Sequence, residues 1–174
     1  MITKENLQIV VTNRKNNLFD LSHQHPVLLV FLRHFGCIFC RESMMVMSRE
    51  KEALEKQGIH LVMVHMSENQ VGEKYLSEFG LSGVEHISDP ECRVYAMFGL
   101  VKGSFSQLFG LKVFIRGTEV ALKNQIYPNS KQIGDGFQMP GVFLLKDGDI
   151  KSSFIHKSIA DKPNYEELVK SCII

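Results

Sequence analysis

The feature that most constrains this chain is a Cys-x-x-Cys motif, Cys37 to Cys40, placed where an apolar run meets an amphipathic stretch. Residues 26–32, before the motif, are almost continuously apolar and predict a buried strand. Residues 40–57, after it, predict a helix of about five turns. The first sulfur then lies at a helix N-terminus, where unpaired amide N–H groups and the helix dipole stabilise a thiolate.

Size and composition favour one globular domain over residues 1–174. The chain has 174 residues, of which 44% are hydrophobic, so it can bury a core without disulfide staples. Its four cysteines are too few for a secreted disulfide framework, and its net charge of +1 favours neither nucleic acid nor an anionic membrane. With no signal-like start and no apolar run of about 18 residues, we expect a cytoplasmic protein without a membrane span.

The hydrophobic pattern alternates between strand-like and helix-like segments. We expect further strands at residues 7–11, 59–65, 85–88, 139–145 and 150–156, and further helices at 67–79, 91–98 and 165–171. Residues 100–134 lack clean periodicity and predict an insertion with one short helix, packed over the site. This order, with the dithiol after the first central strand, predicts an α/β thioredoxin-like fold of three layers, a central mixed sheet with helices on both faces.

Two segments, residues 31–42 and 134–143, resemble the peroxiredoxin-like branch of the alkyl hydroperoxide reductase/thiol-specific antioxidant superfamily. Residues 89–100 and 160–163 are similar to the same superfamily in a looser way. The resemblance implies a thioredoxin fold, a redox-active dithiol and a cis peptide bond before Pro140.

The chain departs from ordinary peroxiredoxins at two positions. Those enzymes carry a threonine three residues before the peroxide-reducing cysteine, where this chain has His34. They also carry an arginine on the facing strand, where this chain has Pro140. The hydroxyl and the guanidinium that polarise a peroxide O–O bond are therefore both missing, which predicts weak peroxidase activity and favours disulfide exchange.

Cys37 is the candidate nucleophile and Cys40 the candidate resolving thiol. Cys-x-x-Cys thiols have pKa values of about 3.5 to 7.5, and the neighbouring Arg33, His34 and Arg41 are positioned in sequence to lower the pKa of Cys37 further. Cys40 follows one helical turn later on the same face, so it can attack Cys37 after that sulfur has bonded to a substrate.

The candidate substrate-binding residues are His34, Phe35, Gly36, Met139 and Pro140. The resemblance implies that Pro140 sits against the dithiol and that Met139 presents its backbone to an extended substrate. His34 is open to two interpretations, an acid–base group that tunes the thiolate or a histidine hydrogen-bonded at a strand end.

These residues and patterns together predict a thiol-dependent oxidoreductase that acts on a peroxide or a disulfide without cofactor or metal. An external thiol such as thioredoxin or glutathione would regenerate it, and we expect a monomer or weak homodimer. Two alternatives stay open from the sequence. One is a non-catalytic binding module with a silent dithiol, and the other is a zinc site that adds His23 and His25 to the two cysteines.

Overall fold

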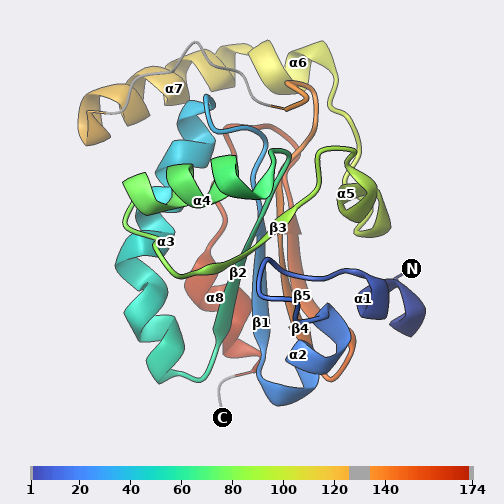
Figure 1. Cartoon of the computed structure of the whole chain (residues 1–174). Helices are drawn as coiled ribbons and strands as arrows, with labels where there is room; N and C mark the ends of the chain where they lie inside the picture. The colour runs from blue at the N-terminus through green and yellow to red at the C-terminus, as the bar shows by residue number, and fades with distance from the viewer. Residues whose placement is uncertain (1, 126–133, 173–174) are drawn as a thin grey trace.

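The computed structural model describes residues 2–125 and 134–172, and these are built around a five-stranded sheet in the order β3-β2-β1-β4-β5 (Figure 1). The central strand β1 pairs in parallel with β2, which pairs in parallel with β3, whereas β4 and β5 are antiparallel additions on the other side. The strand bounds are β1 Val27–Phe31, β2 His60–His65, β3 Glu85–Ser88, β4 Gly141–Lys146 and β5 Asp149–Ile155. The expected strands from residue 26 onward are thus confirmed.

Helices cover both faces of the sheet (Figure 1). Leu28 and Val30 of β1 pack with α3, α4 and α8, while Val27, Leu29 and Phe31 pack with α1, α2 and α5. This alternation buries β1 on both sides and confirms the three-layer thioredoxin-like fold. The helices are α1 Lys4–Ile9, α2 Leu18–Gln24, α3 Ile38–Lys56, α4 Asn69–Glu78, α5 Arg93–Met97, α6 Phe105–Phe109, α7 Leu111–Asn124 and α8 Tyr165–Lys170.

The N-terminal prediction was wrong, because residues 7–11 do not form a strand. Thr3 and Asn6 form a reciprocal capping box that starts α1, and Leu7 is the buried anchor of that helix. A second helix, α2, was missed, although Asn17 caps it by accepting from the Asp20 N–H at 2.9 Å. A run of apolar residues as short as 7–11 cannot be assigned by periodicity alone, so the local caps decide.

Helix α5 ties the two central strands together at the edge where the dithiol lies. The Asp89 carboxylate caps α5 by accepting from the N–H groups of Arg93 and Val94, at 3.0 and 2.7 Å. The buried Tyr95 hydroxyl donates to the backbone carbonyl of Leu32, just after β1, and to that of Val64, the last residue but one of β2. These contacts fix the start of the loop that leads to Cys37.

The insertion contains two helices, α6 and α7, rather than the one short helix expected from its weak pattern. Helix α7 runs across the N-terminal part of α3 (Figure 1). Arg116 on α7 donates to both carboxylate oxygens of Glu42 on α3 at 2.9 Å. Part of the predicted insertion, residues 126–133, lies outside the described residues, and a single domain over the whole chain stays a prediction.

No helix within the described part of the chain is long and apolar enough to cross a bilayer.

Candidate active site

The two cysteines lie where the chain passes from β1 into α3. Cys37 occupies the N-cap position of α3, Cys40 is in the first turn of that helix, and the Cys37 N–H donates to the His34 carbonyl at 3.0 Å. Both are free thiols with side chains only 5% and 3% exposed. The expected position of Cys37 at a helix N-terminus is therefore confirmed.

The surroundings of the two sulfurs make their acidities very different. A hydrogen bond from the Cys40 side chain lowers the pKa of Cys37 to about 6 in spite of burial, and the positive charge of Arg33 adds to the lowering. Burial, followed by the hydrogen bond to Cys37, raises the pKa of Cys40 well above its usual range. At neutral pH, Cys37 is the thiolate and Cys40 the proton-bearing partner.

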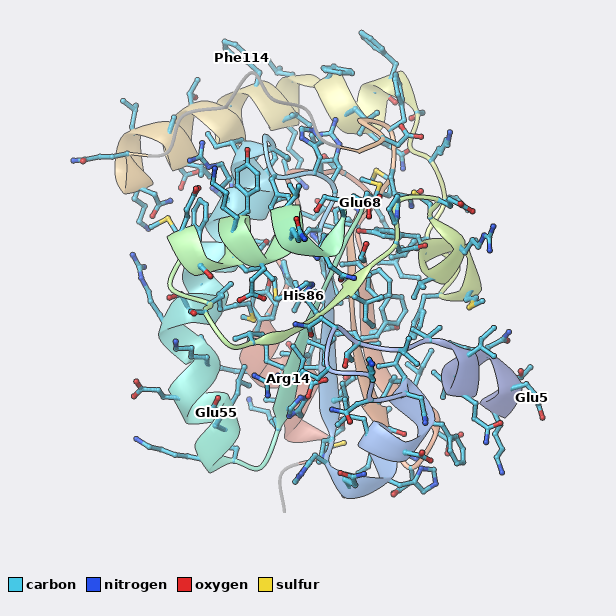
Figure 2. All side chains as sticks on the ribbon, viewed as in Figure 1. Glu5, Arg14, Glu55, Glu68, His86 and Phe114 are labelled. Atoms are coloured by element: carbon cyan, nitrogen blue, oxygen red, sulfur yellow. The ribbon has the colours of Figure 1, made fainter. Side chains whose placement is uncertain are left out.

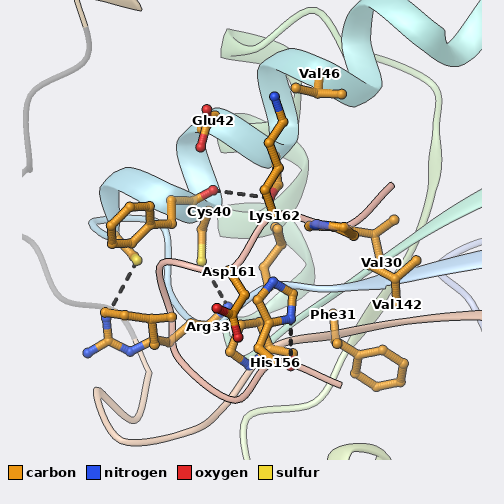
Figure 3. A pocket seen from close by; sticks show the side chains of 18 of the residues that line it. Val30, Phe31, Arg33, Cys40, Glu42, Val46, Val142, His156, Asp161 and Lys162 are labelled. Carbon is orange, nitrogen blue, oxygen red and sulfur yellow. Dashed lines mark hydrogen bonds between the residues drawn. The ribbon is translucent and has the colours of Figure 1, made fainter. Parts of the chain in front are cut away.

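Arg33 is a buried arginine that contacts both halves of the dithiol (Figure 3). Its Nη1 donates to Cys37 Sγ at 3.5 Å, and its backbone N–H donates to Cys40 Sγ at 3.1 Å. The guanidinium is held in place by the Gly136 carbonyl, which accepts from Nε at 2.7 Å and also from Nη2. With only 7% of its surface exposed, Arg33 is a fixed charge rather than a solvated one.

This contact corrects an inference from the sequence, namely that the site lacks a guanidinium. Pro140 stands just before the facing strand β4, as the sequence indicates, but Arg33 brings a guanidinium to the Cys37 thiol. The sequence placed Arg33 among three neighbouring residues able to lower the pKa of Cys37, but it did not indicate a direct contact. Its role depends on the Gly136 carbonyl, 103 residues away in the chain, which no local pattern reveals.

A narrow cavity of about 30 Å³ adjoins the dithiol (Figure 3). Its walls include Arg33, Cys37, Cys40, Pro140 and Tyr165. A space of this size admits about two water-sized groups.

A groove of about 790 Å³ lies between α3 and α8, beside the cavity. The cavity and the groove share four wall residues, Val46, Lys162, Pro163 and Tyr165. The two spaces are therefore neighbours, and their volumes differ by more than an order of magnitude.

Pro140 lines the cavity, but the bond before it is trans, so the expected cis peptide is wrong. Trans is the favoured state of an X-Pro bond, and here it leads an extended chain into β4. The Met139 N–H donates to the Val101 carbonyl at 3.2 Å, and the Pro140 carbonyl accepts from His156 Nδ1 at 3.1 Å. The Met139 side chain is buried, 3% exposed, against Gly103.

The other three predicted substrate-binding residues form the loop between β1 and α3 and do not line the cavity. Burial and then the charge of Arg33 lower the pKa of His34 to about 4, so its ring is neutral at physiological pH. Its Nδ1 is buried and has no hydrogen-bond partner among the described residues. Phe35 stacks on Tyr75 with ring centroids 4.7 Å apart, and Gly36 is buried in the turn.

A buried polar chain that the sequence did not reveal lies beneath this loop. His65 Nε2 and His86 Nδ1 are 2.8 Å apart, Ser67 Oγ lies 3.0 Å from His65 Nδ1, and Glu73 accepts from His86 Nε2 at 3.1 Å. A Cβ on Gly72 would come within 2.1 Å of His65 Nε2, so only glycine lets α4 approach the ring this closely. These hydrogen-bonded side chains join α4 to β2 and β3, and the His65 ring packs against Phe35.

We expect these histidines to make the fold sensitive to acid. Burial and then the charge of His86 lower the pKa of His65 to about 3, whereas an unfolded histidine titrates near 6.5. Below pH 6.5, therefore, His65 binds a proton in the unfolded chain but stays neutral in the folded one. Because of this difference, the free energy of unfolding falls by about 1.4 kcal/mol for each pH unit of acidification. Urea denaturation of the parent and of His65→Gln between pH 7 and about 4.5 measures this.

The variant should show a shallower loss of stability on acidification, by about one proton, although it starts less stable at pH 7. His23→Gln, on the exposed surface of α2, is the matched control. Equal slopes for the parent and His65→Gln would contradict the assignment of this titration to His65.

The zinc alternative finds no support in the geometry of the described residues. Across residues 2–125 and 134–172, no group of three or more histidine, cysteine or acidic side chains is placed to hold a metal ion.

Comparisons with known proteins agree with the resemblance noted in the sequence. The model of the AhpC/TSA antioxidant enzyme family matches residues 46–158 and begins just after the dithiol. The chain is 24% identical over 161 residues to the thioredoxin-like protein AAED1, chloroplastic, of Arabidopsis thaliana, covering 88% of this chain but only 64% of that protein. It is 28% identical over 170 residues to the prostamide/prostaglandin F synthase of Danio rerio, covering 95% of this chain and 83% of that protein.

Solved structures with the same fold include redox proteins of two kinds. The bacterioferritin comigratory protein of Xanthomonas campestris matches with a TM-score of 0.64 at 11% identity, over 92% of this chain and 88% of that one. A protein described as a thiol:disulfide interchange protein DsbE from Chlorobium tepidum matches with a TM-score of 0.57 at 17% identity, over 92% and 88%. At these identities the likeness establishes the fold alone.

Proposed function

This chain belongs to the AhpC/TSA antioxidant enzyme family, and on that premise we propose that it is a thiol-dependent peroxide reductase with Cys37 as nucleophile and Cys40 as resolving thiol. The observation that carries the proposal is the placement of Cys37 Sγ in a small cavity, 3.5 Å from the Arg33 guanidinium. A thiolate beside a fixed cation can attack an oxygen while the cation stabilises the negative charge on the departing one.

The proposed cycle begins when the Cys37 thiolate attacks the terminal oxygen of a hydroperoxide. The S–O bond forms, the O–O bond breaks, and the alkoxide leaves beside Arg33 and takes a proton from water. Cys37 is then a sulfenic acid. Cys40 attacks Cys37 sulfur, its proton leaves with the hydroxyl as water, and an intramolecular disulfide remains. An external dithiol such as thioredoxin, or two molecules of glutathione, then supplies the two electrons and two protons that restore both thiols.

The size of the cavity favours a peroxide over a protein disulfide as the substrate. About 30 Å³ accommodates a hydroperoxide group, whereas an approaching protein disulfide needs an exposed sulfur and Cys37 is only 5% exposed. The neighbouring groove between α3 and α8 offers space for the organic part of an alkyl hydroperoxide. The silent-dithiol alternative is disfavoured because the lowered pKa of Cys37 is the property of a reactive thiol.

The test of this proposal is to trap the first intermediate. We expect the reduced parent protein to consume an organic hydroperoxide faster than hydrogen peroxide and to end with a Cys37–Cys40 disulfide, seen as a loss of two mass units. Cys40→Ser should react once and stop as a Cys37 sulfenic acid, which dimedone labels.

A matched control is Cys172→Ser, which should cycle like the parent. No reaction of the parent with any hydroperoxide, or full recycling by Cys40→Ser, would refute the proposed roles. Rapid reaction with a small disulfide instead would identify a disulfide reductase.

A further inference from the structure

The inserted helices expose an apolar surface that the chemistry at Cys37 does not use. We call it the α6–α7 face, and define it by Phe105 and Phe109 on α6 and Leu111, Phe114, Ile115 and Leu122 on α7. These six side chains are between 57% and 81% exposed. Figure 2 shows Phe114 on the outer side of α7, away from the sheet.

Helix α7 carries apolar side chains on two opposite sides. The fully buried Val120 belongs to the core beneath it, Val113 packs against that core, and Gly117 faces Phe39 on α3, whose Cζ would lie 3.9 Å from a Cβ at this position. Leu111, Phe114, Ile115 and Leu122 recur at spacings of three, four and seven residues, which places them on one stripe of the helix. A helix that is apolar on both sides is normally buried on both sides.

The size of the α6–α7 face matches one half of a stable protein–protein interface. Large apolar and aromatic side chains exposed to this degree contribute about 100–150 Å² each, so six of them present on the order of 600–900 Å². A standard interface buries about 800 Å² on each partner, whereas the largest apolar patch of a monomer is usually about 300–600 Å².

The charges around the face argue against a lipid surface or a nucleic acid. Three of the basic side chains nearby are neutralised within the chain, since Lys102 pairs with Asp135 at 2.7 Å, Lys112 with Asp161 at 2.5 Å and Arg116 with Glu42 at 2.9 Å. On α7 itself, Glu119 and Lys123 have opposite charges. An anionic headgroup therefore finds little net positive charge here, whereas depletion of charge is typical of homodimer interfaces.

We propose that the α6–α7 face is the interface through which two copies of this chain associate about a two-fold axis. A single helical stripe is self-complementary in an antiparallel arrangement, because Leu111 near one end of α7 then meets Leu122 of the other copy. Helix α7 has 14 residues, about 21 Å, which is long enough for such a pair to pack over several turns.

The interface would be anchored to the rim of the reactive cavity. Glu42 and Asp161 both line that cavity, and they are the acceptors of the Arg116 and Lys112 ion pairs from α7. Association that buries the outer side of α7 also holds its inner side on α3, next to the dithiol.

Sedimentation velocity of the full chain, kept reduced so that no intermolecular disulfide forms, tests the proposal over a wide range of concentration. We expect a species of twice the chain mass of 19.8 kDa that dissociates on dilution. Phe114→Glu and Leu111→Glu should each raise the dissociation constant at least about thirtyfold, the effect of a central interface residue. Ile9→Glu, at an equally exposed apolar position on α1, should sediment as the parent does.

Thermal unfolding and the iodoacetamide reactivity of Cys37 establish that each variant is folded, and neither measurement depends on peroxide turnover. A parent that is monomeric at every concentration overturns the proposal, as does a dimer that persists in both glutamate variants. A monomer that instead co-sediments with vesicles of phosphatidylcholine and phosphatidylserine, and loses this with Phe114→Glu, overturns it in favour of a lipid surface.

Discussion

Replacing Cys37 with serine is expected to reduce peroxide consumption to the rate seen without protein. A serine hydroxyl stays protonated at neutral pH, and Arg33 cannot compensate because it stabilises an anion that no longer forms. The parent, with the pKa of Cys37 lowered to about 6, is about nine-tenths thiolate at pH 7. An ordinary thiol, with a pKa of about 8.5, would be only about 3% ionised. Stopped-flow peroxide reduction measures the difference.

The pH dependence of the parent's peroxide-reduction rate is a second test of Cys37, because it reports the ionisation of that thiol. Its rate should rise with pH through a midpoint near 6 and be flat above pH 7, because only the thiolate attacks. Cys92→Ser and Cys172→Ser control for the loss of a thiol as such, and both should keep the parent's rate and midpoint. Residual turnover in Cys37→Ser, or its loss in Cys92→Ser, would mean that another sulfur does the chemistry.

The parts of the fold that sequence reasoning predicted correctly are those in which local pattern and tertiary burial agree. Residues 59–65 are nearly all apolar because β2 is covered on both faces, and that pattern is visible without a structure. Residues 7–11 are apolar for a different reason, since Leu7 and Val10 anchor a short helix and its exit. At five residues, hydrophobicity does not distinguish these cases, and the Thr3 cap was the signal available.

In the candidate site, too, the features that follow from neighbouring residues were predicted and those that depend on long-range contacts were not. The dithiol and its place before a helix follow from residues that are neighbours in sequence. The position of the Arg33 guanidinium depends on a carbonyl more than a hundred residues away, and the polar chain under Phe35 joins His65 to His86 across two strands. Contacts of that kind arise from the fold, so the sequence did not indicate that a guanidinium contacts the Cys37 sulfur.

Removing the guanidinium tests that contact directly. In Arg33→Met we expect the pKa of Cys37 to rise toward the ordinary thiol range, because both the charge and the hydrogen bond of Arg33 are lost and only the side-chain and backbone hydrogen bonds from Cys40 still oppose burial. The second-order rate constant with peroxide should fall by about 10²–10³-fold, the usual loss when one donor to a developing oxyanion is removed. Stopped-flow kinetics between pH 5 and 9 gives both quantities.

The two consequences of this substitution are separable. The loss of ionisation is recovered at high pH, whereas the loss of a donor to the departing oxygen persists there. Arg33→Lys keeps the charge but cannot donate to the Gly136 carbonyl and the Cys37 sulfur in the same fork-like geometry, so its rate should lie between the other two. Arg49→Met, on the exposed surface of α3, is the matched control and should not change the profile. If Arg33→Met keeps a midpoint near 6 while its rate falls, Arg33 acts on the peroxide alone. If neither changes, Arg33 is structural and the peroxide reductase loses its electrostatic basis.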